Sequence, residues 1–244
     1  MDKKNATKKL HELDDITAAT ILKARASWSM FSIMSEFIET TEQLSSLKKA
    51  VSIFGSARTP NNDPYYLQCV EVARRLSDEG FAVISGGGPG IMAAANQGAF
   101  PGRSLSIGLN IDLPAEQSPN PWQDVALHFR HFFARKVAFV KYADAYILFP
   151  GGFGTLDELC ETLTLIQTQK SRKIPVILVG SAFWSGLLAW LQEVLVPHGT
   201  LSESDVALIT VIDETDRIVE TILSFCADHR NAPTDEEKQK RMYL

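Results

Sequence analysis

Two glycine-rich segments, each placed between a short apolar run and a helix-like segment, constrain this chain more than any other feature. The first has the sequence SGGGPG at residues 85–90, and the second has PGGFGT at residues 150–155. At such a junction, backbone N–H groups and the dipole of the following helix converge on an anion, and glycine lets a phosphate approach the backbone closely. Neither segment ends in Gly-Lys-Ser/Thr, so a triphosphate with magnesium is not indicated.

Short apolar runs alternate with helical patterns from residue 50 onward. We expect strands at 51–54, 81–84, 105–109, 125–129, 145–149, 175–179 and 208–211, and helices at 64–79, 91–99, 132–142, 156–168, 183–194 and 214–225. This alternation predicts an α/β fold, a Rossmann-like doubly wound parallel sheet with helices on both faces. Ligands bind such sheets at the carboxyl ends of the strands, where the strand order reverses. Residues 110–124 form a long polar connection, which we predict to be a functional loop.

The chain changes character near residue 50, which suggests three parts. Residues 1–49 are predicted to form an N-terminal helical extension, 50–227 a Rossmann-like nucleotide-binding domain, and 228–244 a polar tail. Within 14–49, apolar residues recur near the helical period of 3.6 residues. The apolar face of this extension is expected to cover its own domain or a second subunit.

The composition is that of an ordinary globular protein. The chain has 244 residues, a net charge of −5 and 45% hydrophobic residues, and this balance favours neither nucleic acid nor a membrane as a partner. No apolar run reaches the ~20 residues of a membrane span, and residues 1–13 do not resemble a secretory signal. Cys69, Cys160 and Cys226 are widely spaced, which predicts reduced thiols in a cytoplasmic protein. His128 and His131 have no acidic or cysteine partner nearby, so no metal site is expected.

Two acidic residues, Asp157 and Glu158, follow the second glycine-rich segment directly. A carboxylate beside a phosphate is electrostatically unfavourable, so it needs a separate reason. One reason is a capping box in which Thr155 is the N-cap and Glu158 reaches back to its amide. The other is catalysis, because Glu161 lies on the same side of the helix as Glu158, and paired carboxylates beside an anion site suit hydrolysis of a sugar bond. Spacing alone leaves both interpretations open.

Arg130, Arg135 and Lys136 form the densest basic group near the glycine-rich segments. Arg135 and Lys136 are adjacent in a mostly apolar helix, so their charges cannot share one face. In one interpretation, one charge is solvated and the other forms a structural ion pair. In the other, Arg135 points into the crevice at the strand ends, towards a phosphate or a carboxylate.

Three motifs, taken in order, resemble the LOG (Lonely Guy) family of nucleoside 5′-monophosphate phosphoribohydrolases. They are SGGGPGIM at 85–92, FARK at 133–136 and PGGFGTLDE at 150–158, and the last matches the family pattern PGGxGTxxE without a gap. The resemblance covers about residues 50–225, and the extension before it is similar to that of the longer bacterial members. It implies hydrolysis of the N-glycosidic bond of AMP or of an N6-modified AMP such as a cytokinin ribotide, without any cofactor or metal. It also implies a homo-oligomer, either a dimer or an assembly of dimers.

The same resemblance assigns roles to residues of this chain. Arg135 and Glu158 would form the catalytic pair. The phosphate and the rest of the substrate would be held by Gly151, Gly152, Gly154, Thr155, Gly87, Gly88, Gly90, Ser56 and Lys136.

Two other functions compete with hydrolysis. A carrier of molybdenum cofactor, which is a phosphorylated pterin, resembles this chain in the glycine-rich segments but needs no hydrolytic carboxylate. An NAD-dependent oxidoreductase would use the looser dinucleotide pattern of Gly88, Gly90 and Ala93, with Asp112 about 20 residues further on. That pattern follows the second expected strand, whereas the standard one follows the first. Family members are often labelled lysine decarboxylases, yet no lysine here is a clear Schiff-base candidate.

Overall fold

The structure is a computed structural model that describes residues 27–114 and 118–228, together with Thr20 and Lys23. The polar tail beyond Asp228 and most of the first 26 residues lie outside the described residues, so the structure does not address the predictions made for them.

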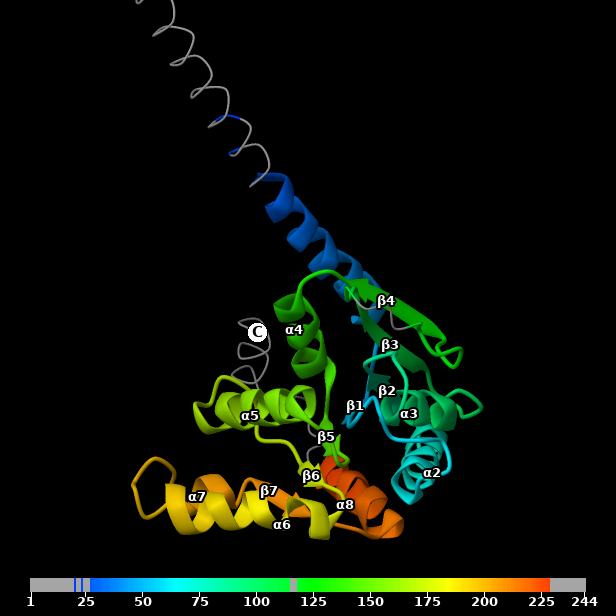
Figure 1. Cartoon of the computed structure of the whole chain (residues 1–244). Helices are drawn as coiled ribbons and strands as arrows, with labels where there is room; N and C mark the ends of the chain where they lie inside the picture. The colour runs from blue at the N-terminus through cyan, green and yellow to red at the C-terminus, as the bar shows by residue number, and fades with distance from the viewer. Residues whose placement is uncertain (1–19, 21–22, 24–26, 115–117, 229–244) are drawn as a thin grey trace, which may run out of the picture.

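Seven strands form one parallel sheet (Figure 1). They are β1 (Ala50–Phe54), β2 (Ala82–Ser85), β3 (Ser106–Ile111), β4 (Val125–Phe129), β5 (Ala145–Leu148), β6 (Val176–Leu178) and β7 (Ile209–Val211), in the order β4-β3-β2-β1-β5-β6-β7. All neighbouring pairs are parallel, as predicted. The chain builds outward from β1 to β4 and then returns to the other side of β1. The order therefore reverses between β1 and β5, and a crevice opens beyond their carboxyl ends.

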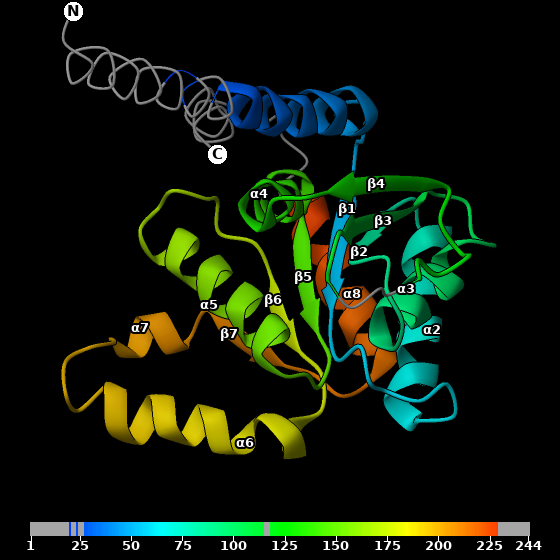
Figure 2. The ribbon, with the colours of Figure 1, turned by 45° about the horizontal axis from the view of Figure 1, so that its top comes forward.

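Helices cover both faces of the sheet, as predicted for a doubly wound fold (Figure 2). One face carries α2 (Pro64–Asp78), α3 (Ile91–Ala99) and α8 (Thr215–Asp228), and the other carries α4 (Phe132–Tyr142), α5 (Phe153–Gln167) and α6 (Ser181–Trp190). Side chains of a strand alternate between the two faces. In β1, Val51 and Ile53 pack into the core under α2 and α3, whereas Ala50 and Phe54 pack under α4 and α5.

Several boundaries differ from the predicted ones for local reasons. Helix α5 begins three residues before the predicted start, because the backbone turns helical directly after Gly152. Helix α6 ends at Trp190 and continues as a π-helical turn, Leu191–Leu195 (η1). The four-residue helix α7 (Glu203–Val206) is absent from the prediction. It begins with a capping box between Ser202 and Asp205 and is too short to show apolar periodicity.

The described part of the N-terminal extension is one helix, residues 27–44, which we call the N-terminal helix. Its C-terminal part lies against the domain near α4 and β4, and its first turns project away from the domain (Figure 1). Leu44 is buried in the core under α4, and Phe37 packs against it. The first turns expose their apolar side chains, including Trp28 and Phe31. Within the described part of the chain, no helix is both long enough and apolar enough to cross a bilayer.

Candidate functional site

A cavity of about 760 Å³ opens at the carboxyl ends of the central strands, where the strand order reverses. Its walls come from the segments after β1, β2 and β5, from the end of β3 and the residues after it, and from α3, α4 and α5. Of the site residues predicted from the sequence, those that line it are Ser56, Gly88, Arg135, Gly152, Gly154, Thr155 and Glu158. Gly87, Gly90, Gly151 and Lys136 lie outside the lining.

The second glycine-rich segment leads from β5 into α5 and presents the start of this helix to the cavity. Gly152 is the N-cap, and no side chain caps the helix. The predicted capping box of Thr155 and Glu158 is therefore wrong: the helix has already begun at Phe153, and the N–H of Thr155 donates to the carbonyl of Gly152 at 3.0 Å. The first N–H groups of a helix have no partner within it. A Cβ on Gly152 or Gly154 would meet nothing within 4 Å, and both residues line the cavity, so the backbone at the start of α5 is open to it.

The loop after β1 is joined to this segment. The N–H of Ser56 donates to the carbonyl of Pro150 at 3.0 Å. A Cβ on Gly151 would overlap the hydroxyl of Thr155 and lie 3.1 Å from the nitrogen of Ser56. Gly151 therefore permits the close packing behind the open amides, while Thr155, which is buried, lines the cavity.

Glu158 lies in the second turn of α5 and is 9% exposed. Burial raises the pKa of its carboxyl to about 7. The charges of Lys136 and Arg135 act in the opposite direction, and that of Glu161 adds to the rise. A carboxyl group with such a pKa exchanges a proton near neutral pH, which suits a general acid or base.

Arg135 lies on α4 and is held at the ends of two strands. Its Nε donates to the carbonyl of Leu109 at 2.7 Å, and its Nη2 donates to the carbonyl of Gly86 at 3.2 Å. A Cβ on Gly86 would overlap Nη2, so only glycine leaves room for this arrangement. Burial lowers the pKa of Arg135 to about 10, although the charge of Glu158 opposes this change. The guanidinium is therefore charged at neutral pH, and it lies in the cavity wall as one of the two sequence interpretations expects.

The side chain of Lys136 does not line the cavity. Its Nζ lies 2.9 Å from Asp157 and 3.0 Å from Glu161, so it links α4 to the acidic face of α5. This is the structural ion pair that the other interpretation assigns to one of the two adjacent cations.

The first glycine-rich segment is tied to the long connection after β3. Asn120 donates from its backbone N–H to the carbonyl of Gly87 at 2.8 Å and from its side chain to that of Gly88 at 3.1 Å. The side chain of Gln123 donates to the carbonyl of Gly87 at 3.0 Å. The later part of the connection, residues 118–124, is thus anchored to the segment, whereas residues 115–117 are not described.

Sequence reasoning missed several lining residues, of which Asn110 is the most informative. Its side chain is 6% exposed, and Nδ2 donates to Gln123 Oε1 at 2.9 Å and to the carbonyls of Leu127 and Gly108. These acceptors turn Oδ1 towards Gly87 and the cavity. A polar residue near the end of an apolar strand is the signal that could have identified it. The other lining residues that the prediction missed are mainly apolar: Phe132, Phe139, Phe153, Met92, Ile111 and Leu113.

The remaining predicted chemistry lies away from the cavity. Cys69, Cys160 and Cys226 lie on α2, α5 and α8, and none of the three is in a disulfide. No cluster of three or more His, Cys, Asp or Glu able to hold a metal ion occurs among the residues that the structure describes.

The sequence matches one family model, described as "Possible lysine decarboxylase", over residues 92–222, which is more than half of the chain. Among curated proteins, the chain is 26% identical over 191 residues to cytokinin riboside 5′-monophosphate phosphoribohydrolase LOG1 of Arabidopsis thaliana, covering 77% of this chain and 88% of the relative. It is 29% identical over 166 residues to the enzyme LOG of Oryza sativa subsp. japonica, covering 66% and 67%.

Solved structures with a similar fold include two molybdenum cofactor proteins. The binding protein from Rippkaea orientalis has a TM-score of 0.54 and 24% identity, covering 73% of this chain and 98% of that one. The carrier protein from Chlamydomonas reinhardtii has a TM-score of 0.53 and 20% identity, covering 74% and 99%. At these identities the likeness shows the fold alone. The family match is decisive: the chain belongs to the LOG family, whose model is described as possible lysine decarboxylase and whose curated members are named phosphoribohydrolases.

Proposed function

We propose that this protein hydrolyses the N-glycosidic bond of nucleoside 5′-monophosphates, AMP or an N6-modified AMP, to give the free base and ribose 5-phosphate. One observation carries the proposal: a buried carboxyl with a pKa of about 7, Glu158, lines the same cavity as the uncapped start of α5. An anion site and a proton-exchanging carboxyl side by side suit a substrate that has a phosphate near the bond to be broken.

In this proposal, the 5′-phosphate binds the open amides of residues 152–154. The helix dipole and the charge of Arg135 both favour an anion at this end of the cavity. The apolar walls, which include Phe132 and Phe139, suit the flat face of a base. The ribose then lies between the two, next to Glu158.

The reaction breaks the bond between C1′ and the base nitrogen, and the bonding electron pair leaves with the base. The ionised carboxylate of Glu158 stabilises the positive charge that develops on the ribose and accepts a proton from the attacking water. The water oxygen bonds to C1′, and the departing base takes up a proton. Arg135, fixed by the carbonyls of Leu109 and Gly86, orients the nucleotide and balances its charge.

The alternative is a carrier that binds a phosphorylated ligand without changing it, a function supported by the fold shared with the molybdenum cofactor proteins. A carrier has no use for a buried carboxyl that titrates near neutral pH, so Glu158 favours the enzyme. The oxidoreductase alternative depends on Asp112 and the first glycine-rich segment. Asp112 is exposed and lies 3.9 Å from Arg130, and this function leaves the second segment unexplained.

The test is a panel of AMP, an N6-modified AMP, GMP, CMP and UMP, with adenosine as the matched control without phosphate. Released base and ribose 5-phosphate are measured by chromatography. We expect base release from AMP or N6-modified AMP, and release from adenosine slower by a factor of about 100 because the phosphate anchor is lost. Tight binding of a nucleotide without base release from any of them would contradict hydrolysis and favour the carrier.

A further inference from the structure

Glu36 is a buried carboxylate on the N-terminal helix, outside the cavity. It is 7% exposed, whereas Glu39 and Glu42 on the same helix are exposed. A buried carboxylate is costly unless it is hydrogen-bonded. Its partners therefore indicate why this helix keeps an acid on the face that packs against the domain.

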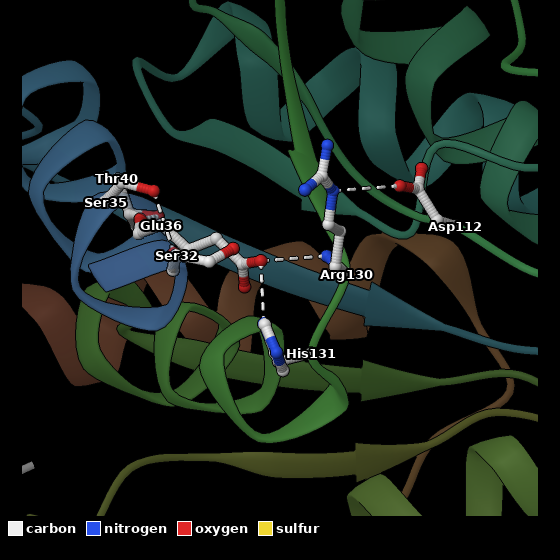
Figure 3. A network of polar contacts seen from close by, with 7 residues as sticks. All are labelled: Ser32, Ser35, Glu36, Thr40, Asp112, Arg130 and His131. Carbon is white, nitrogen blue, oxygen red and sulfur yellow. Dashed lines mark hydrogen bonds and ion pairs between the residues drawn. The ribbon is translucent and has the colours of Figure 1, made fainter. Parts of the chain in front are cut away.

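One oxygen of Glu36 holds two consecutive residues of the connection between β4 and α4 (Figure 3). Glu36 Oε1 accepts from the backbone N–H of Arg130 at 3.1 Å and lies 2.9 Å from Nδ1 of His131. The ring of His131 also packs against Phe133, with 5.4 Å between ring centroids. The N-terminal helix thus contacts, through Glu36, the two residues immediately before α4.

Helix α4 has no side-chain cap at its N-terminus. His131 is its N-cap residue, yet no side-chain hydrogen bond caps the helix, and the ring of His131 is directed to Glu36 instead. Arg135 follows one turn later, and its N–H donates to the carbonyl of His131 at 3.3 Å. Phe132, Arg135 and Phe139 all project from α4 into the cavity wall. A shift at residues 130–131 would therefore move this wall.

The same connection also contacts the end of the neighbouring parallel strand, β3. The backbone N–H of Asp112 donates to the carbonyl of Phe129 at 2.9 Å, and the guanidinium of Arg130 extends to the Asp112 carboxylate at 3.9 Å (Figure 3). Asp112 lies between Ile111 and Leu113, which both line the cavity. Because an exposed ion pair contributes little, the buried contacts of Glu36 are the stronger part of this link.

We infer that Glu36 is a positioning residue for the candidate active site, and that the N-terminal helix is part of the catalytic unit. Its carboxylate fixes the entry to α4, and through α4 the place of Arg135. This inference rests on the proposed function for its effect on turnover, but its effect on the geometry of α4 does not depend on the reaction.

The kinetic test compares Glu36→Ala and Glu36→Gln with the matched control Glu39→Ala in the full chain. We expect Glu36→Ala to raise KM for AMP about tenfold or more, because Arg135 is displaced. Glu36→Gln stays within about threefold of the wild type, since an amide oxygen still accepts from Arg130 N–H, and Glu39→Ala is unchanged. A merely structural role would lower the active fraction, and so the apparent kcat, with KM unaltered. That result, or equal damage from Gln and Ala, would overturn the inference.

Hydrogen exchange separates this inference from the proposed function. Amides of residues 132–139 should exchange about tenfold faster or more in Glu36→Ala than in the wild type or Glu39→Ala. If the wild type releases no base from any nucleotide, the proposed function fails, and the exchange result still decides the role of Glu36. Unchanged exchange at the start of α4 would overturn that role whatever the substrate.

Discussion

The two glycine-rich segments have similar sequences and occupy equivalent places, between a buried strand and a helix, but the structure uses them differently. In the first, a Cβ on Gly86, Gly87 or Gly90 would overlap atoms of the protein itself. In the second, a Cβ on Gly152 or Gly154 would meet nothing within 4 Å. The first segment is packed against its own protein at these three glycines, whereas the second is packed at Gly151 but open at Gly152 and Gly154.

This difference shows that glycine serves packing at Gly86, Gly87 and Gly90, and access at Gly152 and Gly154. The carbonyls of the first segment are used by Asn120, Gln123 and Arg135, so it forms a fixed wall that holds the arginine in place. The second segment presents the uncapped start of α5 to the cavity, with Glu158 further along the same helix. Four substitutions test this difference between the two segments.

The largest effect is expected from Glu158→Gln, which removes the titrating carboxyl beside the open segment. Loss of a general base lowers kcat by about 10²–10⁴-fold. Folding should be little affected, because Glu158 does not cap helix α5 in the structure. Base release from AMP and the urea midpoint of unfolding check the two halves of this prediction. Full activity in Glu158→Gln would show that the carboxyl is not catalytic.

Gly87→Ala tests the closed segment. Gly87 has φ of +75°, and its new Cβ would overlap Asn110 Oδ1, so we expect a loss of about 3 kcal/mol in the free energy of unfolding. Gly186→Ala on α6 is the control, since a Cβ there would meet nothing within 4 Å. Urea denaturation measures both variants. If the two are equally stable, the first segment is not the packed wall described above.

Gly154→Ala tests the open part of the second segment. In contrast to Gly87→Ala, it should keep the stability of the fold and weaken ligand binding. Alanine favours the helix by less than about 1 kcal/mol, so stability is kept or slightly increased. The added methyl group enters the open space where Gly154 lines the cavity, and we expect the Kd for ribose 5-phosphate to rise about tenfold. Calorimetric titration measures this change. An unaltered Kd would place the phosphate elsewhere.

The smallest effect is expected from Lys136→Met, which tests how the surroundings of the open segment set the proton affinity of Glu158. Because Glu158 must be ionised to act, log(kcat/KM) should rise with pH up to about 7 in the wild type. The charge of Lys136 opposes the rise in the Glu158 pKa. Removing this charge should therefore move the rising limb of the pH profile of log(kcat/KM) to higher pH. Lys141→Met on the same helix is the control. A limb that stays in place or moves to lower pH would contradict the assignment to Glu158.

The fold was largely predictable because its signals are local. Apolar runs bounded by glycine mark β1, β2 and β5, and helix α3 and helix α4 have the bounds predicted for them. The predicted capping box of Thr155 and Glu158 is wrong because the helix begins directly after Gly152. The order of side chains along the sequence does not reveal where the backbone becomes helical. The roles of Asn110 and Glu36 were not predicted, for another reason. Their roles depend on partners far along the chain, and Arg130 lies 94 residues from Glu36.

A crystal structure of Glu158→Gln with AMP bound would show where the phosphate and the ribose lie in the cavity. We expect the 5′-phosphate within hydrogen-bond distance of the amides of residues 152–154, with C1′ of the ribose beside the side chain of residue 158. A phosphate bound instead at residues 85–90, with C1′ remote from residue 158, would contradict this expectation.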